Sequence, residues 1–270
     1  MTRRQRLAGR FRMNDIHRAD CIRAMGSMAA GSVDVIVTSP PYNIGIRYSR
    51  YEDSLPFDEY LEWMAEFGRA CARVLKKDGS VFLNIGDRAS DEFRSFLVAR
   101  SVRGDGLVVQ NTIHWVKSIA VPECGINMGH FKPVNSGRYI NNCHEYIFHM
   151  TRTGYVKVNK RAVGVPYADK TNIARWSHSG GSDSRCRGNQ WYIPYETVAS
   201  EKEHPAAFPL RLPEMCIKLA GEGAEKVVLD PFAGSGSTLL AAKGMGMRYI
   251  GFELDPGYVR IARARLAGCT

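Results

Sequence analysis

Short hydrophobic runs alternate along this chain with longer segments in which apolar residues recur every three or four positions. Val33–Thr38 (VDVIVT) and residues 80–85 (SVFLNI) are continuous runs of strand length and predict buried strands. Residues 57–75 carry apolar side chains at helical spacing and predict a long amphipathic helix, with Gly79 suited to its C-cap. This alternation predicts an α/β fold with a doubly wound, mostly parallel sheet.

The same patterns recur towards both ends of the chain. Further strands are predicted at residues 16–21, 107–116, 145–150, Val227–Asp230 and Arg248–Glu253. Further helices are predicted at residues 21–30, 92–102, 210–219 and 258–266, and one beginning at Ser237. Residues 151–200 lack helical periodicity and are punctuated by glycine and serine, which predicts a small insert of loops. We therefore expect a basic N-terminal arm (1–15), two halves of one domain (16–150 and 201–270) and the insert between them.

The positive charge of the chain is unevenly distributed. The net charge is +10, and the insert holds eight Lys and Arg against three Asp and Glu, interleaved with aromatic residues. Residues 1–12 hold five arginines and no acid. Such concentrations of charge favour a polyanionic partner such as nucleic acid. The alternatives are a solvated surface loop for the insert and a frayed terminus for the arm.

The remaining composition argues against several classes of protein. No apolar run is long enough to cross a membrane, and no apolar signal core follows the basic N-terminus. The seven cysteines are odd in number and widely spaced, without a C-x-x-C motif. They therefore predict neither a disulfide framework nor a metal site, and they fit a reducing cytoplasm.

A glycine-rich turn lies between a predicted strand and a predicted helix at residues 227–246, VVLDPFAGSGSTLLAAKGMG. Gly234 and Gly236 allow a ligand to approach the backbone, and the helix beyond them begins with free N–H groups. About 20 residues later a second strand ends in Glu253, and a carboxylate there can bind both hydroxyls of a ribose. The pattern predicts a cofactor that contains adenosine, and the alternative is an ordinary strand-to-helix turn.

The details of this turn favour S-adenosylmethionine over NAD. The dinucleotide fingerprint requires a glycine where Leu239 stands, and the lysine of a phosphate-binding P-loop is absent. Asp230, at the end of the strand, would repel a pyrophosphate but would attract a sulfonium and an ammonium group.

A second motif follows the buried strand Val33–Thr38, which runs directly into Ser39, Pro40, Pro41 and Tyr42. Two prolines end the strand pairing and fix the backbone at the carboxyl edge of the sheet, where open α/β sheets bind ligands. The Ser39 hydroxyl and the Pro40 carbonyl can accept both hydrogens of an exocyclic amino group and aim its lone pair at a methyl sulfonium. Tyr42 offers a flat ring on which a flipped base can stack. A lone proline pair is more often an ordinary turn, so the weight of this motif comes from its coupling to the glycine loop.

These two motifs, TSPPYNIG (38–45) and DPFAGSGST (230–238), resemble those of the amino-directed DNA methyltransferases of restriction-modification systems. Three further segments extend the resemblance: ADCIRAM (19–25), NNCHEYIFHMTRTG (141–154) and HPAAFPLRLPEMCIKL (204–219). The catalytic motif precedes the cofactor loop, which is the order of the β class, and the insert stands where that class has its target recognition domain.

The resemblance implies a seven-stranded, Rossmann-like methyltransferase sheet, S-adenosylmethionine as cofactor with S-adenosylhomocysteine as product, and DNA as partner. The implied catalytic residues are Ser39, Pro40, Pro41 and Tyr42. The implied cofactor-binding residues are Asp20, His204, Pro205, Phe208, Pro209, Asp230, Phe232, Ala233, Gly234, Ser235, Gly236, Ser237, Thr238 and Glu253. The DNA-binding candidates are Lys157, Lys160, Arg161, Arg175, Arg185, Arg187, Asn189 and Gln190.

The first residue of the catalytic motif bears on the target base. Family members with serine there mostly methylate cytosine at N4, and those with aspartate mostly methylate adenine at N6, so Ser39 favours cytosine N4 in double-stranded DNA. Adenine N6 is the alternative, followed by an RNA substrate or an inactive module that binds cofactor and DNA. Carbon-5 methylation is disfavoured because no Pro-Cys motif is present. A prokaryotic or phage-type enzyme is expected, with a cognate restriction endonuclease and a homodimer as open partners and no metal.

Overall fold

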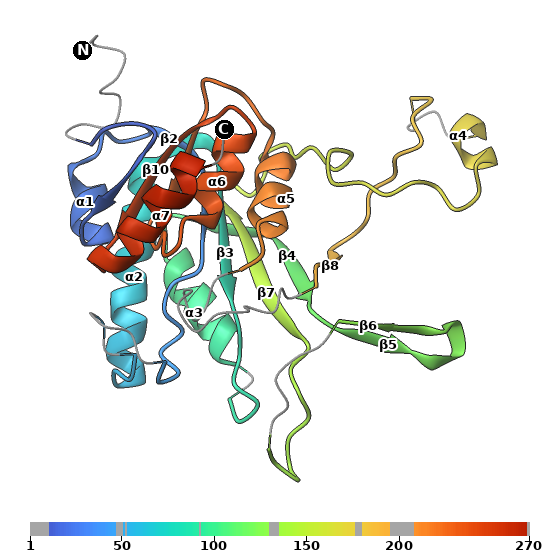
Figure 1. Cartoon of the computed structure of the whole chain (residues 1–270), viewed down its shortest axis with the longest axis horizontal. Helices are drawn as coiled ribbons and strands as arrows, with labels where there is room; N and C mark the ends of the chain where they lie inside the picture. Colours follow the sequence, from blue (N-terminus) through green and yellow to red (C-terminus); the bar gives the residue numbers. More distant parts are fainter. Residues whose placement is uncertain are drawn as a thin grey trace.

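The core of the protein is one twisted sheet, with strands in the order β1-β10-β9-β2-β3-β7-β4-β8 (Figure 1). The computed structural model describes residues 11–46, 51, 53–91, 93–129, 135–175, 180–194 and 208–268. The strands of this sheet are β1 (Asp15–Arg18), β2 (Val33–Thr38), β3 (Leu75–Ile85), β4 (Val108–Val116), β7 (His144–Thr151), β8 (Gln190–Tyr192), β9 (Val227–Asp230) and β10 (Arg248–Glu253).

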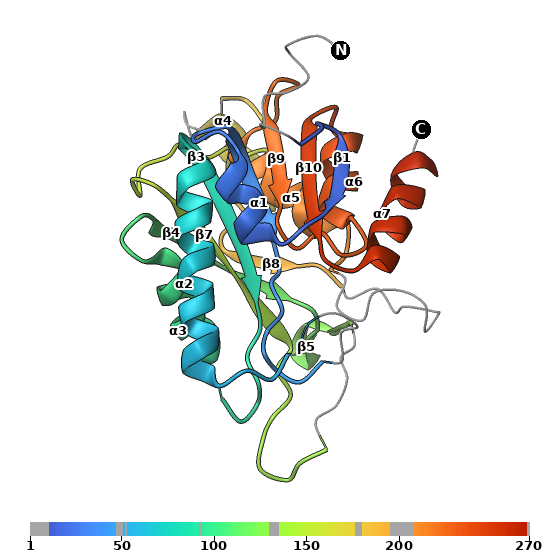
Figure 2. The same cartoon turned by 90° about the vertical axis from the view of Figure 1, so that its left-hand side faces the viewer.

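Helices cover both faces of the sheet (Figure 2). The first three, α1 (Cys21–Ser27), α2 (Phe57–Val74) and α3 (Arg94–Arg103), pack against one another on one face. The last three, α5 (Arg211–Ala220), α6 (Ser237–Gly244) and α7 (Pro256–Gly268), pack together on the other face. The sheet is therefore doubly wound, and the predicted fold class is confirmed.

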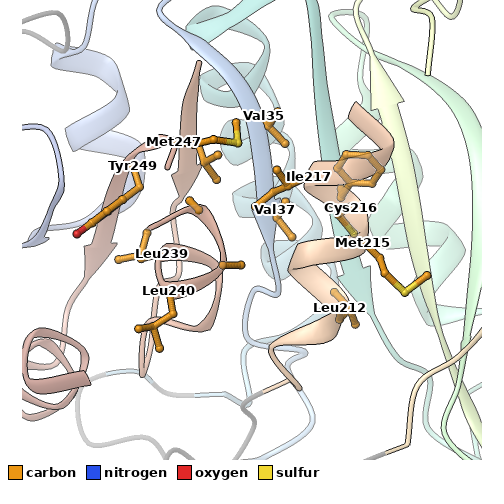
Figure 3. Close-up of a cluster of buried hydrophobic side chains, with 14 of the residues drawn as sticks. Val35, Val37, Leu212, Met215, Cys216, Ile217, Leu239, Leu240, Met247 and Tyr249 are labelled. Atoms are coloured by element: carbon orange, nitrogen blue, oxygen red, sulfur yellow. The ribbon is translucent and has the colours of Figure 1, made fainter. Parts of the chain in front are cut away.

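The central strand β2 explains why the hydrophobic run at 33–38 is continuous rather than alternating. Ile36 belongs to the hydrophobic cluster under α1–α3, whereas Val35 and Val37 belong to the cluster under α5–α7. Figure 3 shows Val35 and Val37 beside side chains of α5 and α6. A strand covered on both faces buries nearly all its side chains, and in β2 only Asp34 is partly exposed, so local sequence alone sufficed to predict it.

Strand direction brings distant segments to one edge of the sheet. The pairs β1–β10, β10–β9, β9–β2 and β2–β3 are all parallel, so the residues that follow these strands lie at the same edge. Strand β7 is antiparallel to both β3 and β4, so its first residues reach that edge as well. The carboxyl ends of the parallel strands and the start of β7 therefore surround a common region.

Two smaller elements project from the body of the protein (Figure 1). The hairpin of β5 (Ile119–Val121) and β6 (Ile126–Met128), closed by the 3-10 helix η2 (Pro122–Cys124), follows β4. The short helix α4 (Thr171–Arg175) lies in the predicted insert. Neither the hairpin nor α4 was predicted from the sequence, because both are too short to show a period.

Two sequence predictions differ from the structure. The sheet contains eight strands among the described residues rather than seven, because Gln190–Tyr192 of the insert adds β8 beside β4. Gly79 is not a helix C-cap: α2 ends at Val74, and residues 76–79 belong to β3. A Cβ on Gly79 would lie 2.9 Å from the Asp34 carbonyl oxygen, so close packing of two strands, and not a helix end, accounts for this glycine.

Candidate active site

A cavity opens at the carboxyl edge of the sheet, between the ends of β1, β2, β9 and β10. Residues from both predicted motifs line it, namely Ser39 and Pro41 from the proline turn and Phe232 from the glycine loop. The described residues that line it are Ala19, Asp20, Cys21, Ser39, Pro41, Tyr51, Trp63, Pro231, Phe232, Phe252, Glu253, Leu254, Asp255 and Tyr258. Two segments almost 200 positions apart in the sequence thus meet at one cavity. The predicted roles of the two motifs require this proximity.

A buried hydrogen bond joins the two motifs. The Thr38 hydroxyl, at the end of β2, donates to Oδ1 of Asp230 over 2.8 Å, and the backbone N–H of Phe232 donates to the same oxygen. Asp230 is only 1% exposed, and burial raises the pKa of its carboxyl to about 6, although the hydrogen bonds from Thr238 and Thr38 oppose that shift. Asp230 therefore fixes the turn, and a nearby cation would stabilise the ionised form of its carboxyl group.

Glu253 ends β10 and lines the cavity. Its Oε2 accepts the backbone N–H of Gly234 over 3.0 Å, and its Oε1 accepts the N–H of Asp255 over 2.8 Å. Burial raises the pKa of this carboxyl, and the two backbone hydrogen bonds oppose that rise. Each oxygen of a carboxylate has a second acceptor site, so Glu253 is oriented by the backbone and can still accept two hydroxyl groups.

Asp20 and an aromatic wall complete this part of the cavity. Asp20 caps α1 by accepting the Arg23 N–H over 2.9 Å, and it also lines the cavity. Trp63 of α2 lies between Tyr51 and Phe232, at ring-centroid distances of 5.6 and 5.7 Å respectively. Neither Tyr51 nor Trp63 was predicted as a site residue. Trp63 carries only the signal of a helix core position, and Tyr51 lies outside the two predicted motifs.

The proline turn leads into a polar cluster, which we call the Tyr42 cluster, formed by Ser39, Tyr42, Asn84, Lys117 and Glu145. The Ser39 hydroxyl donates to Tyr42 Oη over 3.0 Å, and Tyr42 Oη donates to Glu145 Oε2 over 2.9 Å, with Asn84 Oδ1 3.2 Å from the same phenol oxygen. Asn84 Nδ2 donates to Glu145 Oε2 over 3.0 Å, and Lys117 pairs with Oε1. Sequence reasoning identified only Ser39 and Tyr42.

The other described residues that were predicted to contact the cofactor are not part of the lining of this cavity. Thr238 is fully buried near Asp230, whereas the Ser235 hydroxyl accepts a hydrogen bond from Arg265 of α7. Gly236 adopts a positive φ of 87°, and a Cβ there would lie 3.1 Å from Ala262 Cβ. Of the remaining predicted residues, Ala233, Gly234 and Ser237 belong to the turn and the start of α6, and Phe208 and Pro209 precede α5. His204 and Pro205 lie outside the described residues.

The DNA-binding candidates divide into three groups. Lys160, Arg161 and Arg185 line a hollow in the insert together with Tyr167 and Asn172, whereas Lys157, Arg175 and Gln190 are exposed elsewhere. Arg187 and Asn189 instead hold the insert in place. The Arg187 Nε donates to the Val163 carbonyl over 2.7 Å, and the Asn189 Nδ2 donates to the Thr112 carbonyl over 3.0 Å.

Two other kinds of site are absent from the described residues. In the part of the chain that the structure describes, no cluster of three or more His, Cys, Asp and Glu side chains could hold a metal ion. Across the same residues, no helix has the length and hydropathy needed to cross a bilayer.

The donors and acceptors at this edge fit S-adenosylmethionine. Glu253 can accept two hydroxyl groups, which matches a ribose, and Asp20 can accept an amino group at the same end of the cavity. The apolar and aromatic lining suits an adenine ring and a thioether carbon chain. Asp230 is buried without a cationic partner among the described residues, so a sulfonium or ammonium nearby would lower the cost of its ionisation.

Comparison with known proteins agrees with this geometry. Residues 33–264 match a family described as DNA methylase, the N6/N4 methyltransferases. The chain is 30% identical over 271 residues to the Type II methyltransferase M.BglII from Bacillus subtilis, covering 95% of this chain and 69% of that protein. It is 27% identical to M.HpaI from Haemophilus parainfluenzae, covering 92% and 72%.

Two solved structures share the architecture. The PvuII DNA methyltransferase, described as cytosine-N4-specific, superposes with a TM-score of 0.68 at 21% identity, covering 93% of this chain and 85% of that one. A Thermus thermophilus protein in complex with S-adenosyl-L-methionine has a TM-score of 0.65 at 27% identity, covering 94% and 93%.

Proposed function

Because the chain belongs to the N6/N4 DNA methylase family, we propose that it methylates the exocyclic N4 of a cytosine flipped out of double-stranded DNA. The coarser activity follows from membership of the family: the protein is a DNA methyltransferase that acts on amino groups and uses S-adenosylmethionine. The cytosine target is the part that we propose, and it rests on Ser39 at the first position of the catalytic motif.

One observation supports the assignment of the site more than any other. Ser39 and Pro41 line the same cavity as Asp20, Phe232 and Glu253. The bound cofactor supplies an electrophilic methyl group on a sulfonium. The chain must then hold an amino nitrogen in line with that methyl group, and a cavity shared by both motifs supports this role.

The residues of the turn have separate roles in this proposal. The Ser39 hydroxyl and the Pro40 carbonyl accept the two N–H bonds of the amino group, which turns the nitrogen lone pair towards the methyl group. Pro41 restricts the backbone, and Tyr42 supports the flipped base. Asp20 and Glu253 hold the adenosine part of the cofactor, while Asp230 and the glycine loop hold its methionine part.

We further propose that the insert, residues 151–200, recognises the DNA target. Lys160, Arg161 and Arg185 gather around one hollow, which suits contacts with phosphates or base edges. The relatives named above are Type II methyltransferases, so we place this protein in a restriction-modification system. A cognate endonuclease and a homodimer remain predictions.

Nucleoside analysis tests the target base. The protein is expressed in a host that lacks methylation, and genomic DNA is digested and examined by mass spectrometry. N4-methylcytosine is expected, whereas N6-methyladenine would replace the cytosine assignment with its alternative. Methyl transfer to RNA in preference to DNA, or transfer to neither, would contradict the proposed function.

A further inference from the structure

The reaction proposed above requires the loss of a proton. When an amino nitrogen forms a bond to the methyl carbon, the nitrogen becomes positively charged and is a strong acid. Residues 35–51, which include Ser39, contain no Asp, Glu or His that could accept this proton. The fold brings a carboxylate there from a strand more than 100 positions away, because Glu145 lies at the start of the antiparallel strand β7.

An unbroken line of hydrogen bonds runs from the proline turn to this carboxylate. Ser39 Oγ donates to Tyr42 Oη over 3.0 Å, and Tyr42 Oη donates to Glu145 Oε2 over 2.9 Å. Ser39 lines the cavity whereas Glu145 does not, so the line leads from the cavity to a carboxylate beyond it. We propose that Glu145 is the terminal proton acceptor for methyl transfer, reached through Tyr42 and Ser39. This inference rests on the proposed function.

The proton balance of the relay is simple. As the N–C bond forms, the bond between carbon and sulfur breaks, and its electron pair stays on sulfur. One N–H proton of the charged amino group passes to Ser39 Oγ, the Ser39 proton passes to Tyr42 Oη, and the Tyr42 proton passes to Glu145 Oε2. Ser39 and Tyr42 end with the same number of protons as before, and the Glu145 carboxylic acid later loses its proton to water.

The surroundings of Glu145 suit this role. Lys117, which follows β4, pairs with Oε1, and Asn84 from β3 donates to Oε2. These two neighbours orient the carboxylate so that Oε2 faces Tyr42. A further ionisable neighbour is His144 on β7 itself, whose pKa is lowered chiefly by burial. Glu145 therefore has a cationic partner on one oxygen, while the other oxygen is directed at the relay.

Two more ionisable groups face His144 from the neighbouring strands. They are His114 of β4, whose ring centroid is 5.6 Å from that of His144, and Asp87, which follows β3. Burial raises the pKa of the Asp87 carboxyl, although hydrogen bonds from Ser95 oppose that rise. Both groups act on His144 and lie outside the line of hydrogen bonds, so the pH test below compares the wild type with a variant of Glu145 alone.

A glycine makes the approach of Glu145 to Tyr42 possible. A Cβ on Gly86 would lie 2.9 Å from Glu145 Cγ and 3.2 Å from Tyr42 Cε2. Both distances are below ordinary van der Waals contact, so any side chain at position 86 would push the carboxylate and the phenol apart. Gly86 directly follows β3, and only glycine leaves room there for both the Glu145 and the Tyr42 side chains.

Single-turnover methylation tests the relay with two variants that keep the shape of the site. Glu145→Gln retains an acceptor for Tyr42 but removes the basic carboxylate, and Tyr42→Phe retains the ring but breaks the line of hydrogen bonds. Each is expected to slow methyl transfer about 100-fold or more, the usual effect of losing a proton acceptor. The double variant should be no slower than either single variant, because both interrupt the same path.

Further measurements separate a relay from a purely structural role. Affinity for S-adenosylmethionine and for DNA should stay within about twofold in Glu145→Gln. At saturating S-adenosylmethionine, where the pH dependence of cofactor binding through Asp230 no longer limits the rate, the wild-type rate should decline at acid pH and that decline should disappear in the variant. Glu222→Gln, at an exposed site between α5 and β9, is the matched control and should match the wild type. Independently of activity, the ¹³Cζ NMR signal of Tyr42, assigned by its loss in Tyr42→Phe, should shift in Glu145→Gln.

The outcomes distinguish the relay from the function on which it rests. If the wild type transfers methyl groups and the rate of Glu145→Gln lies within about threefold of the wild-type rate, the relay alone is overturned. The same holds if the losses of the two single variants multiply in the double variant. An unchanged Tyr42 signal in Glu145→Gln would also overturn it. Absence of methyl transfer by the wild type would overturn the proposed function as well.

Discussion

The cofactor end of the cavity and the insert use charge in opposite ways. At the cofactor end, Asp230 is 1% exposed and hydrogen-bonded to Thr38, and backbone N–H groups orient Glu253. In the insert, Lys160, Arg161 and Arg185 are all exposed to solvent. A few buried acids in fixed positions can select one small ligand, whereas exposed cations act additively on a long polyanion.

This difference predicts where substitutions will act. Changes at the buried edge should act mainly on one step, either cofactor binding or methyl transfer, because each group there is held in one position. Changes in the insert should weaken DNA binding gradually.

The largest effect is expected from Tyr42→Ala. Removal of the ring eliminates base stacking, worth about 1–3 kcal/mol, and interrupts the Tyr42 cluster. Turnover should fall at least about 100-fold, measured with radiolabelled methyl transfer to DNA. Affinity for S-adenosylmethionine, measured by calorimetry, should hardly change because Tyr42 does not line the cofactor cavity. A variant with full activity would remove the site assignment.

Glu253→Gln should impair cofactor binding rather than methyl transfer. The neutral amide would replace charge-assisted hydrogen bonds, each worth about 1.5–3 kcal/mol, so affinity for S-adenosylmethionine should fall roughly 10- to 100-fold. Calorimetry measures this loss directly, with Glu222→Gln as the exposed control. Unchanged affinity would mean that Glu253 does not hold the cofactor.

The affinity for S-adenosylmethionine should also depend on pH through Asp230. Burial raises the pKa of this carboxyl to about 6, so the free protein binds a proton there that a cationic ligand must displace. Affinity should weaken by up to about tenfold per pH unit below pH 6 and level off above it. In Asp230→Asn this pH dependence should disappear, and calorimetry from mildly acidic to mildly alkaline pH compares the two proteins.

The same pKa shift gives the sign of an effect on folding. Because the folded-state pKa is raised above the unfolded value of 3.8, the contribution of Asp230 to stability is largest at acid pH and is lost as pH rises towards 6. The ligand-free Asp230→Asn variant should therefore be at least as stable as the wild type at mildly alkaline pH. Thermal unfolding at mildly alkaline pH tests this prediction. A large loss of stability in Asp230→Asn would contradict the inference that the buried Asp230 charge destabilises the fold.

The smallest effect is expected in the insert. Arg185→Ala should weaken DNA binding a few-fold and reduce the salt dependence of binding by about one counterion, while affinity for S-adenosylmethionine is unchanged. Arg187→Ala is the informative partner, because the Arg187 side chain donates to the Val163 carbonyl. It should lower thermal stability more than Arg185→Ala does. If Arg185→Ala and Arg187→Ala weakened DNA binding equally and neither lowered thermal stability, the assignment of Arg187 to holding the insert in place would be wrong.

The sequence by itself determined the strands β2, β9 and β10, whose bounds match the predictions. It also identified both motifs, because a buried strand followed by glycines or prolines is a local pattern. It predicted less well at 76–79, where a strand follows α2 without a turn, and at β8, which is only three residues long.

Only the tertiary structure brought Asn84, Lys117 and Glu145 to Tyr42 and added Tyr51 and Trp63 to the cavity. These residues come from separate elements, and their meeting depends on the order and direction of strands, above all on β7 running against its neighbours. A hydrophobic pattern along one segment reports which face of that segment is buried. It carries no information on which other segment will lie beside it.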